Sequence, residues 1–207
     1  MRRFIFGFLF ACLFVWSGAQ KMEDIFIKMP DDLLVQLEEA WRKDLVALFK
    51  SGKPAVVENT MMGKSILNKL TDDYLLLQST ERSSVEMRLL PLVNNTRIIC
   101  MIQTIYGPVA DSRVSFFTTE WQRLPSDDLF APVDADWFRK DDADPSAVDS
   151  FSSSELFLIK YSLSDEKPTL TAEYMTPHFL DDDNQKAMKV FLKTENKTYE
   201  WRSGRFE

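Results

Sequence analysis

Histidine is scarce in this chain, and its scarcity excludes several classes of enzyme. His178 is the only histidine among 207 residues, which excludes zinc sites built from two or more histidines. A Ser-His-Asp triad would have to use His178, and the chain has no Gly-x-Ser-x-Gly motif to present the serine. His178 follows a predicted strand in a Thr-Pro-His loop, so it remains a candidate for the rim of a site.

The chain also has only two cysteines, Cys12 and Cys100. Cys12 belongs to an N-terminal leader, so the mature protein has no partner for Cys100 and no internal disulfide. Cys100 lies in the most apolar run of the mature chain, which predicts a buried and unreactive thiol. The fold must therefore be stabilised by its hydrophobic core.

Positive charge is in short supply as well. The chain carries 25 lysines and arginines against 32 aspartates and glutamates, a net charge of −7. Nucleic acids and anionic membrane surfaces bind clustered cations, so this composition argues against both kinds of partner. Gly63-Lys64-Ser65 resembles the end of a phosphate-binding loop, but Glu58 stands where that motif needs its leading glycine. No cofactor is expected.

The segment 1–19 has the three parts of a signal peptide. Arg2 and Arg3 precede an apolar run over residues 4–16, and small residues follow at 17–19. We expect cleavage before Gln20 and export to the periplasm or cell surface. The apolar run is shorter than the ~20 residues of a membrane span, so no transmembrane segment should remain after cleavage. An uncleaved N-terminal anchor is the alternative, and lipid attachment at Cys12 is disfavoured.

The mature chain, residues 20–207, is predicted to form a single α+β domain. Apolar residues recur at helical spacing in 22–29 and again in 34–49, which predicts two N-terminal helices. Asp31 or Asp32 could cap the second helix. Short alternating or apolar runs then predict a largely antiparallel sheet of seven or more strands, either curled or split into two sheets. These runs cover residues 55–58, 66–70, 74–78, 85–121, 155–163, 169–174 and 198–202.

The segment 85–121 reads as a three-stranded meander at the centre of the sheet. A two-residue turn at Asn94-Asn95 would connect its first two strands, because asparagine tolerates a positive φ. That turn places Met87 opposite Ile102 and Leu89 opposite Cys100. The predicted pairs share one buried face, and the opposite face is expected to be mixed in polarity.

Residues 124–154 are rich in proline and aspartate and differ from the segments around them. We interpret this acidic excursion as a loop or as a joint between two subdomains, with Trp137-Phe138 folded back onto the body. Residues 181–193 fit the spacing of a helix and that of a strand equally well.

Acidic residues supply weak candidates for chemistry. Asp142 and Asp144 could take part in a loose oxygen site for a metal, although neither begins a complete calcium loop. Asp72 and Asp73 lie in a predicted turn and are rim candidates together with His178 and Trp137. No catalytic residue is assigned, because acidic pairs are too common here to identify a site.

Several motifs in a fixed order resemble a known family. They are Lys28–Asp31, Arg42–Leu45, Leu70–Leu75, Glu86–Pro91 and Tyr199–Phe206. Their order and spacing resemble an exported protein family of Bacteroidales that is catalogued only as a domain of unknown function. The resemblance implies a Gram-negative source and a periplasmic or cell-surface location. It supplies no activity, cofactor or catalytic residue.

Three hypotheses about function follow. The leading one is a non-enzymatic periplasmic or cell-surface protein that binds a partner protein or a small apolar ligand, because no catalytic constellation is found and aromatic residues make up 13% of the chain. The second is a carboxylate-dependent hydrolase acting on carbohydrate or peptide. The third is an envelope lipid carrier or chaperone with an apolar cavity.

Overall fold

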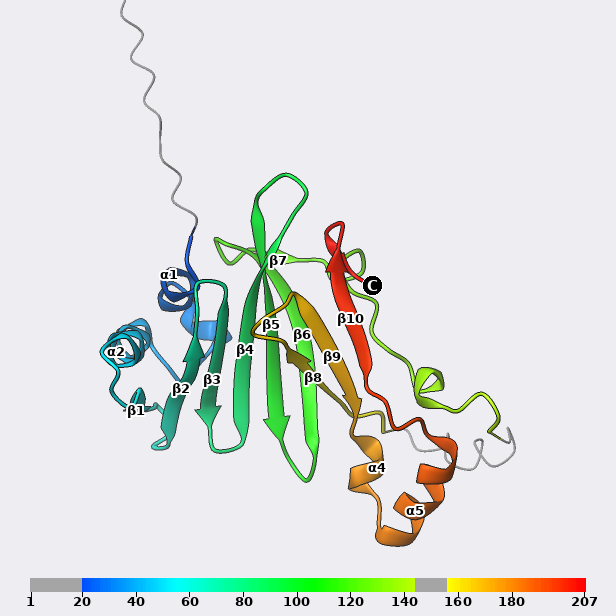
Figure 1. Cartoon of the computed structure of the whole chain (residues 1–207). Helices are drawn as coiled ribbons and strands as arrows, with labels where there is room; N and C mark the ends of the chain where they lie inside the picture. The colour runs from blue at the N-terminus through cyan, green and yellow to red at the C-terminus, as the bar shows by residue number, and fades with distance from the viewer. Residues whose placement is uncertain (1–19, 144–155) are drawn as a thin grey trace, which may run out of the picture.

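The computed structural model describes residues 20–143 and 156–207. The predicted signal peptide and the candidate ligand Asp144 lie outside the described residues. Two antiparallel sheets and a pair of N-terminal helices make up the α+β fold that the sequence predicts (Figure 1). Within the described residues, no helix is long and apolar enough to cross a membrane.

The first sheet has seven strands in chain order, each antiparallel to the next. They are β1 (Val56–Glu58), β2 (Lys64–Leu70), β3 (Tyr74–Thr80), β4 (Ser83–Pro91), β5 (Arg97–Tyr106), β6 (Ala110–Thr118) and β7 (Arg123–Leu124). The second sheet has four strands in the order β11-β10-β9-β8. They are β8 (Ile159–Leu163), β9 (Thr169–Tyr174), β10 (Lys197–Arg202) and β11 (Arg205–Phe206).

Helices lie at two places in the molecule (Figure 1). The N-terminal group comprises α1 (Met22–Ile27), the 3-10 turn η1 (Asp31–Leu33) and α2 (Glu39–Lys50). The other group joins β9 to β10 and comprises α4 (Thr176–Phe179) and α5 (Asp182–Phe191). Residues 181–193, which fit two patterns in the sequence, therefore form a helix over most of their length. A second 3-10 turn, η2 (Asp136–Phe138), lies in the acidic excursion.

Both faces of the central strands are buried. One face packs on the N-terminal helices, where Phe26 of α1 and Met87 of β4 belong to the same core. The other face packs on the second sheet, where Cys100 of β5 and Trp201 of β10 share a second core. Burial on both faces explains the continuous apolar run of β5, since a strand covered on one side only would alternate.

The predicted register of the β4–β5 hairpin is wrong by one residue. Met87 lies opposite Met101, and Leu89 lies opposite Ile99. The turn is longer than predicted, because Leu92 N–H donates to the carbonyl of Thr96 and only Asn95 has a positive φ, 62°. One extra residue in the loop shifts every pair and moves side chains to the other face.

This shift corrects the predicted faces as well. Cys100 lies opposite Arg88 and on the face away from Met87. The expected mixed face, with Glu86, Arg88, Met101 and Gln103, is therefore split: its β4 residues face the second core, whereas Met101 belongs to the first core. Cys100 is nevertheless fully buried, as predicted.

The start of the second N-terminal helix was also predicted wrongly. Asp31 caps no long helix; α2 begins at Glu39, and residues 34–38 are not helical. The reason is Arg42, a fully buried side chain that donates to the carbonyls of the preceding segment. Asp31 receives a hydrogen bond from Arg42 at 2.8 Å instead of capping backbone N–H groups.

Candidate functional site

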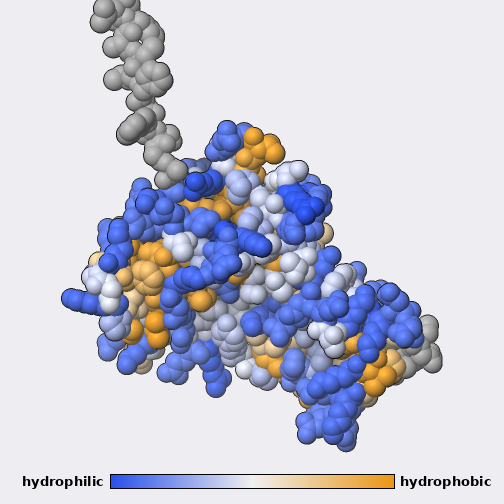
Figure 2. Space-filling view, viewed as in Figure 1, coloured by the Kyte–Doolittle hydropathy of each residue, from blue (hydrophilic) through white to orange (hydrophobic). Residues whose placement is uncertain are grey.

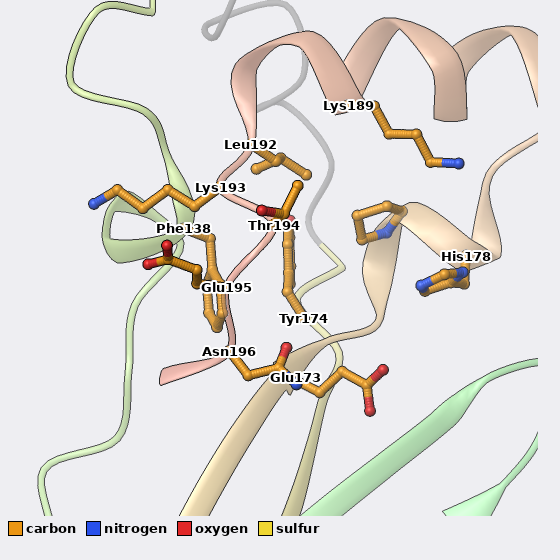
Figure 3. A pocket seen from close by; sticks show the side chains of 11 residues that line it. Phe138, Glu173, Tyr174, His178, Lys189, Leu192, Lys193, Thr194, Glu195 and Asn196 are labelled. Carbon is orange, nitrogen blue, oxygen red and sulfur yellow. The ribbon is translucent and has the colours of Figure 1, made fainter. Parts of the chain in front are cut away.

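A pocket of about 370 Å³ opens where β9 ends and α4 begins (Figure 3). Side chains from η2, β9, both short helices and the segment after α5 line it. They are Phe138, Glu173, Tyr174, Pro177, His178, Lys189, Leu192, Lys193, Thr194, Glu195 and Asn196. Its volume falls near the lower end of the range of roughly 300–1,000 Å³ that is typical of ligand pockets.

Stacked aromatic rings form one wall of this pocket. The rings of Phe138 and Tyr174 lie nearly parallel, with centroids 5.1 Å apart and an interplanar angle of 18°. Phe157 packs on Tyr174 at 5.3 Å, and Trp137 meets the edge of Phe138 at 5.0 Å. Burial raises the pKa of the Tyr174 hydroxyl, so this group stays neutral and can donate a hydrogen bond.

The local sequence explains how the pocket is built. Pro177 stands in the first turn of α4, where its missing N–H costs no hydrogen bond. The hydroxyl of Thr176 accepts from Leu158 N–H at 2.9 Å and so ties α4 to the chain that enters β8. Gln185 Nε2 donates to the carbonyl of Pro177 at 3.2 Å, which holds α5 against α4.

Asp181 fixes the start of α5. Its carboxylate accepts from the backbone N–H groups of Asp183 and Asn184. The hydrogen bond from the Asn184 backbone is the main cause that lowers the pKa of Asp181. This cap supports the helix over the alternative strand pattern, because it satisfies N–H groups that only a helix leaves free.

Charged side chains stand around the mouth of the pocket. Glu173 pairs with Lys160 at 3.4 Å, and Lys193 pairs with Asp141 at 3.6 Å. In Figure 3 the carboxylates of Glu173 and Glu195 point toward opposite ends of the pocket. The charges therefore frame the aromatic wall and do not converge on one point within it.

Apolar surface continues outside the pocket. Figure 2 shows hydrophobic surface at the end of the molecule that carries α4 and α5, among hydrophilic side chains. Phe179 of α4 is 48% exposed, and Val190 of α5 is 63% exposed. The Trp137 ring, which packs on Phe138, also contacts two lysines: the Nζ atoms of Lys193 and Lys197 each lie 5.4 Å from its centroid.

Two of the four rim candidates lie at this pocket. His178 lines it directly, and Trp137 supports the aromatic wall from behind Phe138. Asp72 and Asp73 do not take part: Asp72 pairs with Lys21 at 3.1 Å, and Asp73 pairs with the buried Arg88 at 2.9 Å.

The candidate metal ligand Asp142 lines a shallow hollow that it shares with Lys140 and Lys193. Across residues 20–143 and 156–207, no group of three or more histidine, cysteine or acidic side chains is placed to hold a metal ion. Asp141 and Glu195 line the same hollow, but in the described part of the chain the three carboxylates are not placed as a metal-binding group.

The half-buried side chain of Glu86 connects the two sheets. The carboxylate of Glu86 accepts from Leu163 N–H at 2.7 Å, and burial raises the pKa of Glu86. Burial also raises the pKa of the Cys100 thiol, which keeps it protonated. Glu86 links the two sheets, and Cys100 is part of the core between them. We therefore assign both groups a structural role and do not include them in a functional site.

Sequence reasoning missed Tyr174 and Phe138 as parts of a pocket. Tyr174 was predicted only as a strand residue, and Phe138 only as a residue folded back onto the body. Their meeting depends on the approach of the acidic excursion to the end of α5, where Arg139 forms an isolated bridge with Leu192. The sequence signal that existed was the Thr-Pro-His segment after a strand, which was predicted to be a loop and forms the short helix α4 at the end of β9.

Comparison with known proteins places the chain in a family. The family model described as "Protein of unknown function (DUF3256)" matches residues 14–206. The chain belongs to this family. A solved structure described as a domain of an uncharacterized protein from Porphyromonas gingivalis W83 is 28% identical, with a TM-score of 0.81. The match covers 92% of this chain and 98% of that one. No curated protein matches.

These comparisons confirm the resemblance to a family of unknown function and a relative in the Bacteroidales. They assign no function to the chain.

Proposed function

We propose that this chain is an exported, non-enzymatic protein that binds a small apolar ligand in the aromatic pocket. The observation that carries the proposal is the stacked wall of Phe138 and Tyr174, which faces a space of about 370 Å³. A flat ring or a short apolar group that enters this space would stack on an existing aromatic face. The surrounding lysines, glutamates and His178 would fix its polar substituents.

The pocket is built before any ligand arrives. Hydrogen bonds from Gln185 to Pro177 and from Leu158 to Thr176 hold its walls together. The Tyr174 ring packs against the rings of Phe138 and Phe157. A ligand that meets fixed walls loses less binding free energy to ordering the protein, which favours a binding role.

A carboxylate-dependent hydrolase is supported less well. Glu173 and Glu195 both line the pocket, but their carboxylates point in opposite directions in Figure 3. Hydrolysis by two carboxylates needs both groups to face one bond from opposite sides. Glu173 is also engaged by Lys160.

A lipid carrier is supported less well too. An acyl chain would need an apolar space between the sheets, and aromatic rings fill that region. Phe116 packs on Trp201 with ring centroids 6.5 Å apart, and Phe206 packs on Trp201 at 5.0 Å. Opening such a core would break these contacts.

A dye titration tests the proposal. The probe is 1-anilinonaphthalene-8-sulfonate, whose aromatic rings suit the wall and whose fluorescence rises when it leaves water. The variant Thr194→Trp fills the pocket from an exposed position that lines it, and Thr198→Trp makes the same change at an exposed position outside it.

We expect saturable binding to the wild type and to Thr198→Trp, and an affinity at least about tenfold weaker in Thr194→Trp because the bulky ring occupies the space. Equal affinity in all three proteins would refute the pocket as the binding site. A matching unfolding transition for the two variants would show that both are folded.

A further inference from the structure

A second pocket, of about 320 Å³, lies at the end of the seven-stranded sheet where residues 34–36 cross β3 to β6. Its lining residues are Leu34, Gln36, Ser79, Ser83, Ser84, Val85, Gln103, Thr104, Ile105, Asp111, Ser112 and Arg113. It shares none of them with the aromatic pocket. Strand pairing decides which of these side chains face it.

The register places six of these side chains on the face toward residues 34–36. Gln103 lies opposite Arg113 and next to Val85, while Ile105 lies opposite Asp111 and next to Ser83. The backbone positions of these residues lie on the face of Met87, which packs on the N-terminal helices. Asp111 lies at the end of β6, and one of its carboxylate oxygens is bound by Ile159 N–H of the second sheet. The hydroxyl of Ser79 joins them through a 2.8 Å hydrogen bond to Ser83.

The walls of this pocket are fixed by hydrogen bonds on both sides. Gln103 Nε2 donates to the carbonyl of Leu33 at 3.2 Å, which ties the crossing segment to β5. Thr60 N–H donates to the carbonyl of Gln36 at 3.1 Å, and its hydroxyl donates to the carbonyl of Val35 at 2.9 Å. The polar groups are therefore held in place without a ligand.

The lining supplies both hydrogen-bond donors and acceptors. Amides and hydroxyls can do both, since Gln36, Gln103, Ser79 and Ser83 each combine a donor with an acceptor. Arg113 adds N–H donors, and within the described residues its side chain has no hydrogen bond or ion pair. Its guanidinium is thus free to bind.

The charges of the lining argue against an ionic ligand. Asp111 accepts from Ile159 N–H at 3.3 Å through one oxygen, and its carboxylate would repel an anion held by Arg113. Arg113 would in turn repel a cation held by Asp111. A neutral ligand whose groups both donate and accept satisfies the two side chains together.

Apolar side chains complete the lining. Leu34 and Val85 are buried, and Ile105 is 66% exposed although it lines the pocket. A sugar ring has hydroxyls around its edge and C–H groups on its faces, so it can meet both the polar and the apolar parts of this wall. We propose that this pocket binds a neutral sugar ring, with Arg113 and Asp111 on its hydroxyls and Ile105 against a C–H face.

Saturation-transfer NMR tests this proposal with four neutral sugars as probes: glucose, galactose, mannose and N-acetylglucosamine. We expect transfer to at least one of them in the wild type. Arg113→Ala, at an exposed position, should weaken that binding by about tenfold or more, because a charged donor is lost. The matched control Arg97→Ala changes an exposed arginine at the opposite end of β5 and should leave binding unchanged.

Three outcomes would overturn the proposal. One is the absence of transfer to all four sugars, and another is sugar binding that Arg113→Ala leaves intact. The third is binding of inorganic phosphate that strengthens in Asp111→Asn, since that result identifies an anion site. Thr194→Trp should not change sugar binding, so this test is independent of the aromatic pocket.

Discussion

Arg42 is the residue on which the N-terminal packing depends most. Its guanidinium is buried, donates to the carbonyls of Ile27, Met29 and Leu37, and pairs with Asp31. A single side chain thereby joins the end of α1, the 3-10 turn η1 and the residues just before α2. Charge that is buried in this way is stabilising only while its partners remain.

Replacement of Arg42 should be costly. We expect Arg42→Met to lower the free energy of unfolding by about 3 kcal/mol, because the buried backbone carbonyls that accept from Arg42 would lose their hydrogen-bond donor. Lys43→Met is the matched control, since Lys43 is 57% exposed and pairs only with Glu39 on the helix surface; it should change stability by less than about 0.5 kcal/mol. Urea unfolding of both variants measures the difference, and similar losses would contradict this role.

Glu86 should make stability depend on pH in a specific direction. Burial raises its pKa above the ordinary 4.5, so the folded protein holds the proton more tightly than the unfolded chain. The carboxyl therefore destabilises the fold progressively as pH rises above 4.5, and imposes no such cost below that value. Glu86→Gln removes this titration while keeping an acceptor for Leu163 N–H.

We expect the stability of Glu86→Gln relative to the wild type to increase between about pH 4 and pH 7. Urea unfolding at the two pH values measures the change. A difference that stays constant with pH, or that moves the other way, would show that Glu86 has no raised pKa in the folded protein.

At the scale of elements, the turn between β1 and β2 contains a strained residue. Met62 has a φ of 58° and is 98% exposed, so its side chain gains nothing from the fold that compensates for a left-handed backbone. Asn59 holds this turn, since its side chain accepts from the N–H groups of Met61 and Gly63.

Glycine at position 62 should therefore stabilise the protein. We expect Met62→Gly to raise the free energy of unfolding by about 0.5 to 1 kcal/mol, because glycine adopts this backbone without strain. Met61→Gly is the control at a neighbouring exposed position without a positive φ, and it should lower stability by a similar amount. Thermal unfolding compares them, and equal effects at both positions would contradict the assignment of strain to Met62.

Elements were easier to predict from the sequence than their registers. The alternating runs of β9 and β10 and the helical stripe of α1 show their own periodicity, so short-range patterns were enough. The β4–β5 register depends on whether the turn holds two residues or three, and Asn94 and Asn95 are compatible with both. Residues 34–38 were assigned to a helix because nothing in the local sequence reveals that the Arg42 side chain donates to the carbonyl of Leu37.

The pockets could not be predicted in the same way. The aromatic pocket brings Phe138 and Tyr174 together from segments far apart in the sequence, and the second pocket depends on where residues 34–36 cross the sheet. The prediction that His178 lies near a site agrees with its place in the lining of the aromatic pocket, at the end of β9. Asp72 and Asp73 share the same kind of turn position, yet they pair with cations and line neither pocket.

At the scale of the whole molecule, export remains a prediction. The mature protein isolated from its source should begin at Gln20, because signal peptidase cleaves after the small residues at 17–19. Mass spectrometry of the intact protein measures this directly. A mass that includes residues 1–19 would indicate an uncleaved anchor, and a lipid-modified Cys12 would indicate a lipoprotein.

The central claim is that an apolar ligand binds at the aromatic pocket, and chemical-shift mapping tests it most directly. Labelled protein is titrated with 1-anilinonaphthalene-8-sulfonate, and backbone amide shifts are followed by two-dimensional NMR. We predict that saturable shifts cluster at Tyr174, His178 and Leu192 and disappear in Thr194→Trp. Shifts that spread over the surface without saturation, or that persist in Thr194→Trp, would contradict the claim.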